Sequence, residues 1–155
     1  SLRFTPWARA VEVATAPQLH VEESMWVTNK GNAREPIGER VIVTPVNLER
    51  TTLGDSRSGY IAYVPPGSIE RGAVIAAKGV GTAPACESCH GTDLQGEGDI
   101  PPLAGRMPNY IVHELILFQT GRRTNPGAAP MVQEASQLTV EDMVDVAAYV
   151  ASRKP

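Results

Sequence analysis

Cys86-Glu87-Ser88-Cys89-His90 is the stretch that contains both cysteines of this 155-residue chain. Two thiols separated by two residues can bind one metal ion, form a redox-active disulfide, or add across the two vinyl groups of one haem. The residue that follows the second thiol separates these chemistries. An imidazole at that position can ligate the iron of a haem that both thiols hold.

The rest of the sequence does not support the other two chemistries, metal binding and a redox-active disulfide. A zinc site needs two further ligands, but there is no second cysteine pair, and His20 and His113 lack ligand spacing. A thioredoxin-like dithiol follows a βαβ pattern, whereas this pair follows a short predicted helix and a turn. The stretch therefore predicts one covalent haem c on Cys86 and Cys89, with His90 as an iron ligand. Zinc binding and dithiol chemistry remain the alternatives.

Composition describes a globular chain that forms one small domain with an extension. Hydrophobic residues make up 42% and charged residues 20%, as in soluble globular proteins, and no apolar run is long enough to span a membrane. The net charge of -3 excludes the basic surface that nucleic acid requires, so we expect no such partner. Aromatic residues make up only 5%, which fits a core that a large buried cofactor completes. No signal peptide is present, so we expect that any export signal has been removed.

Residues 67–155 predict helices that are separated by loops. Residues 68–78 form the first helix, and its small residues, such as Gly72, allow another helix to approach closely. Residues 109–120 form the second, which is apolar on more than one side. Thr139 is a typical N-cap for the last helix. Its core face comprises Val140, Met143, Val144, Ala147, Val150 and Ala151. Residues 91–107 are rich in Gly and Pro and predict no regular structure.

Residues 1–66 predict a mixed α/β, loop-rich extension without a haem motif. A helix is expected over residues 8–14, because a proline precedes it and suits a first helical turn. Four short runs favour β-strands: residues 19–21, 25–27, 41–43 and 59–64. Trp7 and Trp26 are predicted to anchor the core of this extension, which we expect to act as a cover or a docking surface.

Residues 67–155 resemble the class I c-type cytochromes, especially the bacterial monohaem domains that are similar to one half of the diheme periplasmic cytochromes c. The resemblance rests on several motifs in the family's order. They are Cys86–Gly91, Pro101–Gly105, Tyr110 at a helix start, Met131, Leu138-Thr139 at the final helix and Ala147-Ala148-Tyr149 within it. It implies a mainly α fold that surrounds one covalent haem.

The resemblance also implies roles for single residues. His90 is the proximal iron ligand, and the carbonyl of Pro101 accepts a hydrogen bond from its imidazole. Met131 is the sixth ligand, and Arg106 and Tyr110 donate to the haem propionates. The alternatives to Met131 are less well placed: Met107, Met143, Met25 and His113, the last expected as a partly buried, hydrogen-bonded histidine. Tyr149 is expected to pack against the helix at residues 68–78.

A haem with both a His and a Met ligand has no open position for a substrate, so we expect an electron carrier and not an enzyme. Its partners are a donor and an acceptor among the redox proteins of the bacterial periplasm. One alternative is a cytochrome subunit of a larger, membrane-bound oxidoreductase or oxidase complex, which the extension favours. A second alternative is a haem sensor or enzyme whose sixth position is open or labile.

Overall fold

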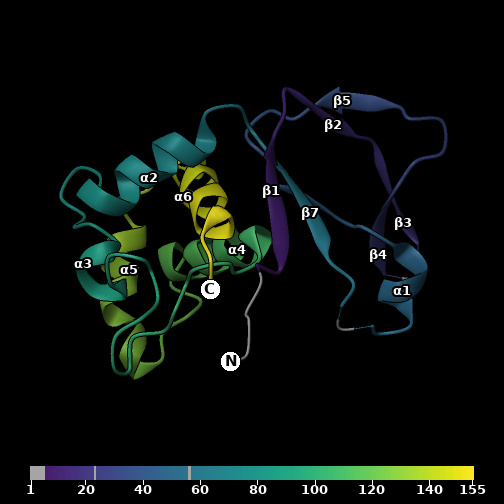
Figure 1. The fold of residues 1–155 in the computed structure, drawn as a ribbon. Helices are drawn as coiled ribbons and strands as arrows, with labels where there is room; N and C mark the ends of the chain where they lie inside the picture. Colours follow the sequence, from purple (N-terminus) through teal and green to yellow (C-terminus); the bar gives the residue numbers. More distant parts are fainter. Residues whose placement is uncertain (1–5, 23, 56) are drawn as a thin grey trace.

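The computed structural model describes residues 6–22, 24–55 and 57–155, and its strands lie with one short helix on one side and the other helices on the other side (Figure 1). The strands are β1 (Ala8–Glu12), β2 (Thr15–Pro17), β3 (Leu19–Glu22), β4 (Met25–Thr28), β5 (Arg34–Pro36), β6 (Ile42–Pro45) and β7 (Tyr60–Val64). The helices are α1 (Leu48–Thr52), α2 (Ser68–Lys78), α3 (Glu87–His90), α4 (Pro108–Gln119), the 3₁₀ turn η1 (Pro126–Ala128), α5 (Ala129–Ala135) and α6 (Val140–Ser152). Within these described ranges, no helix is both long enough and apolar enough to cross a membrane.

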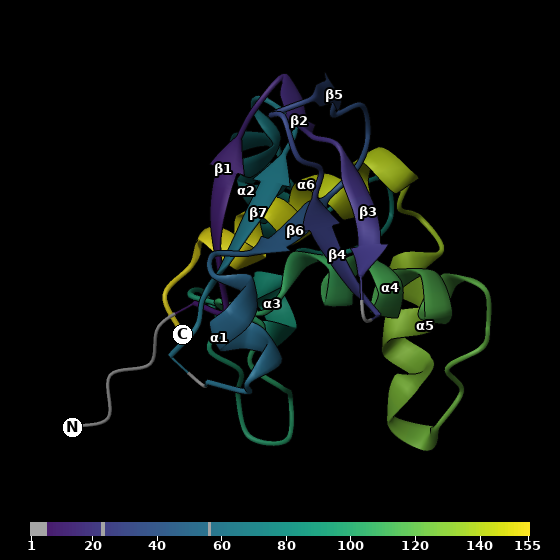
Figure 2. The ribbon, with the colours of Figure 1, turned by 90° about the vertical axis from the view of Figure 1, so that its right-hand side faces the viewer.

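The N-terminal strands form one three-stranded sheet and two hairpin-like pairs. In the larger sheet the order is β1-β7-β6, with β1 parallel and β6 antiparallel to β7. This sheet lies in front of α6 in Figure 2. The four β-prone runs are confirmed as β3, β4, β6 and β7. The helix predicted over residues 8–14 is wrong, because Ala8–Glu12 pairs with Tyr60–Val64, a strand far along the chain.

The two tryptophans do not anchor a core, and that prediction is wrong. Trp7 is 62% exposed and Trp26 is 58% exposed. Trp26 lies opposite Val21 in the two-stranded sheet that β3 and β4 form. Val21 is also exposed. The small core of this part is aliphatic instead, with its buried members at Ala16, Ile37 and Ile42.

The predicted helices of the second part are confirmed. The helix at 68–78 has the predicted bounds, and the helix predicted at 109–120 is α4. Thr139 caps α6 through its hydroxyl, which accepts from the Asp142 N–H at 3.1 Å, while the Asp142 carboxylate accepts from the Thr139 N–H at 2.8 Å. All of the predicted core face of α6 is buried except Val140, its first residue. Residues 91–107 contain no helix and no strand beyond one isolated bridge.

Helices α2 and α6 meet through the small-residue face that the sequence predicts. A Cβ atom on Gly72 would lie 2.0 Å from the carbonyl oxygen of Asp145, so no larger residue fits. Beside this contact, Arg71 donates to both carboxylate oxygens of the buried Asp145, at 2.7 and 2.8 Å. A paired, two-point hydrogen bond of this kind satisfies the buried charge. The contact thus fixes how closely the two helices pack.

Gly72→Ala is expected to destabilise the protein strongly. The added methyl group would force α2 away from α6, and overpacking against backbone atoms should lower the free energy of unfolding by about 3 kcal/mol or more. Denaturant unfolding followed by circular dichroism measures this. Val74→Ala is the control, because Val74 is an exposed residue of the same helix and its loss should change the free energy by less than about 0.5 kcal/mol. Equal stabilities for the two variants would contradict the packing argument.

The strand-containing part is joined to the helical part by specific hydrogen bonds. The Trp7 N–H donates to the carbonyl of Gly105 at 3.1 Å, and the Ile69 N–H donates to the Glu12 carboxylate at 2.9 Å. The second contact satisfies a free N–H in the first turn of α2, an end that has no side-chain cap of its own. Strand β1 therefore contacts α2, and the residue before it contacts the loop at residues 91–107.

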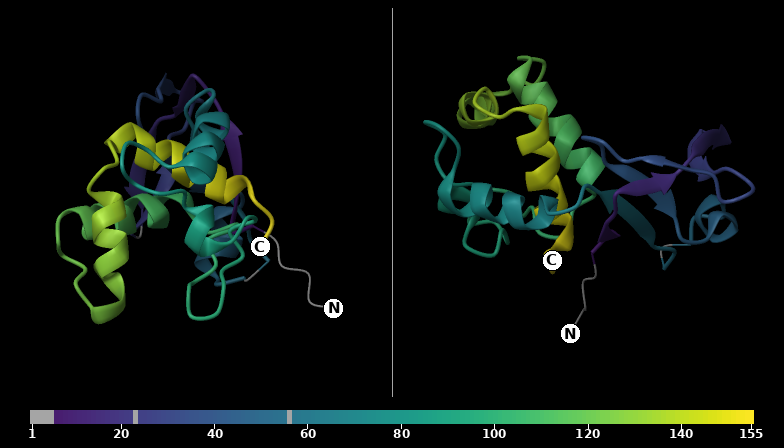
Figure 3. Two further views of the ribbon diagram at one scale, coloured as in Figure 1. Left: turned by 90° about the vertical axis from the view of Figure 1, so that its left-hand side faces the viewer. Right: turned by 90° about the horizontal axis from the view of Figure 1, so that it is seen from above.

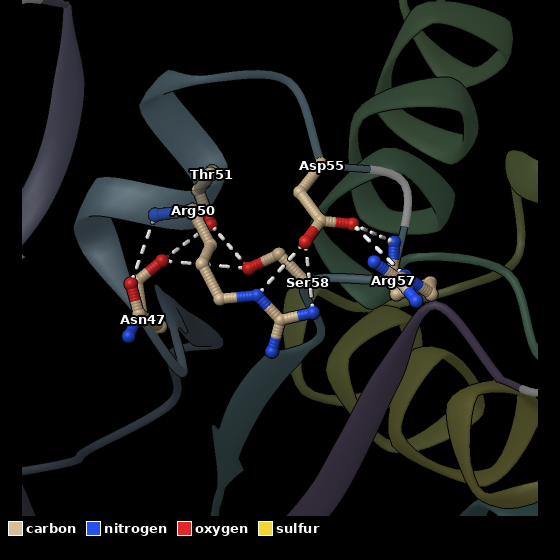
Figure 4. A network of polar contacts seen from close by, with 6 residues as sticks. All are labelled: Asn47, Arg50, Thr51, Asp55, Arg57 and Ser58. Atoms are coloured by element: carbon tan, nitrogen blue, oxygen red, sulfur yellow. Dashed lines mark hydrogen bonds and ion pairs between the residues drawn. The ribbon is translucent and has the colours of Figure 1, made fainter.

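A polar network around α1 orders the connection between β6 and β7 (Figure 4). Asn47 caps α1 by accepting from the Arg50 N–H at 2.8 Å. The Asp55 carboxylate accepts from the Arg57 N–H at 2.9 Å and from the Arg50 guanidinium at 2.9 Å. These hydrogen bonds lower the pKa of Asp55 below its usual value, the Arg57 backbone contact first. The network thus favours the charged carboxylate and links Asp55 to Arg50 and Arg57.

Candidate haem site

The two cysteines and the histidine lie on one short helical turn. Cys86 is the N-cap of α3 and His90 is its last residue, and the His90 N–H donates to the Cys86 carbonyl at 2.9 Å. Residues three and four apart share one side of a helix, which brings Cys86 close to both Cys89 and His90, although Cys89 is exposed and His90 is buried. A porphyrin that is held at two edges and ligated from beneath needs this arrangement.

The imidazole of His90 is buried and has a fixed orientation. It is 6% exposed, and its Nδ1 lies 2.8 Å from the carbonyl oxygen of Pro101. A carbonyl only accepts, so Nδ1 carries the hydrogen and Nε2 keeps the lone pair that a metal needs. The contact that the resemblance implies for Pro101 is therefore present. Its geometry fits an axial iron ligand.

The loop that carries Pro101 is held in place by Leu94. The carbonyl of Leu94 accepts from the N–H groups of Leu103 and Ala104, at 2.8 and 3.0 Å. Leu94 is fully buried and has a φ of 57°, a left-handed conformation that is unusual for a branched side chain. Burial of this residue thus offsets its backbone strain and fixes the loop beside His90.

The environment of the Cys86 sulfur favours an uncharged group. Cys86 and Cys89 are both free, with Cys86 half-buried and Cys89 exposed. Burial raises the pKa of the Cys86 thiol to about 11, which favours an uncharged sulfur. In addition, the described residues contain no group of three or more His, Cys, Asp or Glu side chains that could hold a metal ion.

Met131 lies in the first turn of α5 and packs, half-buried, against the main hydrophobic core. Cys86 and Leu103 border the same core cluster. The residues around Met131 are helical, because η1 and α5 occupy residues 126–135. Each of these elements starts with a proline at one of its first two positions. That signal could have revealed them.

Figures 2 and 3 show α5 and the loop at residues 91–107 extending in one direction from α4 and α6, on opposite sides of the molecule. The loop carries Pro101, the partner of His90, and α5 carries Met131. The two segments that carry these candidate residues therefore lie apart from each other.

The other candidate residues are more exposed or are explained by packing. Arg106 is exposed and donates to the Pro102 carbonyl at 3.3 Å. Tyr110 is 48% exposed in the first turn of α4. His113 was expected to be partly buried, and this is wrong, because it lies on the solvent side of α4, with only a 3.5 Å contact to its neighbour Glu114.

The remaining methionines differ from Met131 in their surroundings. Met143 is completely buried in α6, where packing accounts for it. Met25 lies on β4, and Met107 immediately precedes α4. Among the four, Met131 alone lies on α5, the segment on the side of the molecule opposite the loop at 91–107.

Tyr149 packs against α2 as predicted and also contacts α3, the helix that carries Cys89 and His90. A Cβ atom on Gly72 would lie 2.9 Å from the Tyr149 Cβ. The Tyr149 hydroxyl donates to the Glu87 carboxylate at 3.4 Å, and burial raises the pKa of Tyr149, with Glu87 contributing. The sequence gave no sign of this bond, because 62 residues separate its partners.

Residues 69–154, more than half of the chain, match the family model for cytochrome c. The chain belongs to the cytochrome c family. Cytochrome c-552 of Acidithiobacillus ferridurans is 48% identical over 69 residues, 44% of this chain and 29% of that protein. The cytochrome subunit of sulfide dehydrogenase of Chlorobaculum tepidum is 38% identical over 64 residues, 41% of this chain and 56% of that protein. The chain thus spans less than two thirds of both relatives.

A crystal structure of reduced cytochrome c4 from Pseudomonas stutzeri has a similar fold. It superposes with a TM-score of 0.55 and 25% identity, over 69% of this chain and 67% of that one. The cofactor of the cytochrome c family is haem c, which the protein binds covalently. Transfer of electrons by this haem is the activity of the family.

Proposed function

We propose that this cytochrome carries single electrons on one covalent haem, ligated by His90 and Met131, between redox proteins of the bacterial periplasm. The observation that carries the proposal is the buried His90 imidazole, whose Nδ1 donates to Pro101 at 2.8 Å directly beside the cysteine pair. When bound, the haem supplies a reversible exchange between ferrous and ferric iron. The chain's own residues determine how that exchange is used.

Those residues attach the cofactor and keep it six-coordinate. Thioether bonds from Cys86 and Cys89 prevent loss of the haem when redox partners exchange. The soft sulfur of Met131 favours the ferrous state and fills the position that a substrate would need. The surrounding apolar core excludes water. This set of residues supports a carrier and not an enzyme.

Residues 1–66 contain no cysteine, so we propose that they hold no covalent haem and act as a cover for the helical part. The hydrogen bonds from Trp7 to Gly105 and from Ile69 to Glu12 support this role. The first of these reaches the loop that carries Pro101. Arg106 and Tyr110 stay proposed donors to the haem propionates.

A second candidate function is that of a subunit in a larger oxidoreductase. The observation that favours it is the exposure of large apolar side chains in the N-terminal part: Trp7, Val21, Trp26, Val46 and Leu53. A contiguous exposed apolar patch marks an interaction site, and Val21 and Trp26 lie opposite each other on β3 and β4. One relative is by name the cytochrome subunit of sulfide dehydrogenase. Size-exclusion chromatography of the protein from its native cells separates the two functions, because a carrier elutes alone and a subunit elutes with its enzyme.

A potentiometric titration of the purified protein tests the carrier function. We expect a single transition that follows a one-electron curve, with one iron per chain by metal analysis, because the sequence has one attachment motif. Ferrous protein should not bind carbon monoxide rapidly, since the sixth position is filled. Two irons per chain, two transitions or rapid carbon monoxide binding would contradict the proposal, and the last result would favour the sensor.

A further inference from the structure

Helix α5 is too short to hold its own position. It has seven residues, and its N-cap, Ala128, forms no capping hydrogen bond through a side chain. An isolated helix of this length is unstable in water. The placement of Met131 in its first turn must therefore depend on contacts between α5 and the rest of the protein.

Gln119, the last residue of α4, supplies such a contact. Its side-chain Nε2 donates to the carbonyl of Ala135 at 2.9 Å and to the carbonyl of Leu138 at 2.8 Å. Ala135 is the last residue of α5 and is fully buried, and its carbonyl also accepts from the Leu138 N–H at 3.2 Å. The end of a helix leaves such carbonyls in need of partners outside the helix. Both hydrogens of one amide thus satisfy the end of α5 and the turn that follows.

No other side-chain hydrogen bond within residues 6–22, 24–55 and 57–155 connects α5 or the turn at 136–138 to another helix. The polar side chains of the turn itself bond locally. Ser136 donates to Gln133, and Gln137 donates to the Ser136 hydroxyl at 3.3 Å. Apolar packing also holds α5, through Ala135, Met131 and Val132, but such packing is not directional.

We propose that Gln119 is a positioning residue that holds α5 and thereby keeps the Met131 sulfur at the iron. The inference rests on the proposed ligation by Met131. Without the two hydrogen bonds, α5 can move away from α4 at a lower cost, and the sixth position opens more often. Gln119 itself lies on α4 and has no part in binding the haem.

Competition by imidazole for the iron of the full-length ferric protein tests this role. Gln119→Leu removes both donors, and imidazole should then bind about fivefold more tightly, as loss of hydrogen bonds of ordinary strength predicts. Gln119→Glu keeps the shape of the side chain but places carboxylate oxygens next to two carbonyl oxygens. The increase in imidazole affinity should therefore be larger than in Gln119→Leu. In both variants the weak far-red absorption band of ferric iron bound to methionine should disappear on heating before the helices unfold.

Gln137→Leu is the matched control, because it makes the same exchange in the turn after α5 but removes only a bond to a neighbouring residue. Imidazole binding should stay as in the wild type. If imidazole binds equally tightly to the wild type, both Gln119 variants and the control, the role of Gln119 is overturned. The proposed ligation by Met131 still stands in that case, provided that Met131→Ala loses the far-red band. If Met131→Ala keeps the band, the proposed ligation fails, and the inference is overturned with it.

Discussion

Replacement of both cysteines, Cys86→Ala with Cys89→Ala, is expected to remove all covalently bound haem. In the proposed attachment each thiol would form one thioether bond, and the sequence has no other cysteine to replace them. The variant should also fold poorly, because Cys86, Leu103 and Met131 border the hydrophobic core at half-buried positions that we expect the haem to cover. Denatured wild-type protein should keep its colour in acid acetone and show the mass of the chain with one haem, whereas the variant should be colourless.

The single variants provide the control for attachment. Cys86→Ala and Cys89→Ala each retain one thiol and should each keep a covalent haem through one bond, at a lower yield than the wild type. Transfer of the wild-type colour into the organic solvent would contradict covalent attachment. In that case the cysteines would need another role, and dithiol chemistry would return as the first alternative.

Met131→Ala is expected to open the iron and lower the reduction potential. Loss of the Met131 side chain would remove a sulfur ligand that stabilises ferrous iron. The potential should fall by at least about 60 mV, which corresponds to a tenfold change in the relative stability of the two redox states. The ferric variant should lack the far-red band, and the ferrous variant should bind carbon monoxide rapidly.

Met143→Leu is the control for that experiment. Met143 is fully buried in α6, and an exchange of similar volume should cost less than about 1.5 kcal/mol of stability while leaving the band and the potential unchanged. A wild-type spectrum and potential in Met131→Ala would instead transfer the assignment to Met107. His113 is a poorer replacement, because it faces solvent on α4.

The parts of the fold that sequence could predict are those that local patterns specify. Helices α2 and α6 follow from apolar residues at helical spacing and from the Thr139 cap. Strand β1 was mistaken for a helix, because its partner β7 begins about fifty residues later, and no local pattern reveals that pairing. The exposure of Trp26 was missed for a related reason, since the pair β3–β4 leaves one of its faces uncovered.

The candidate site divides in the same way. Cys86, Cys89 and His90 are adjacent in sequence, so their motif alone indicates a haem. The roles of Pro101 and Met131 could be predicted only from the family resemblance. Both residues are distant from the cysteine motif in sequence, and their spacing from it does not show whether they approach a cofactor. Gln119 could not be predicted at all. Its amide binds backbone carbonyls, and such a partner leaves no trace in residue types.

The absorption spectrum of the wild-type protein in its two redox states tests the central claim most directly. A covalent haem with His90 and Met131 as axial ligands should give a low-spin spectrum in both states, with the weak far-red band in the ferric state and no change when carbon monoxide is added to the ferrous state. A high-spin ferric spectrum without that band, or an immediate shift with carbon monoxide, would contradict the account of a six-coordinate electron carrier.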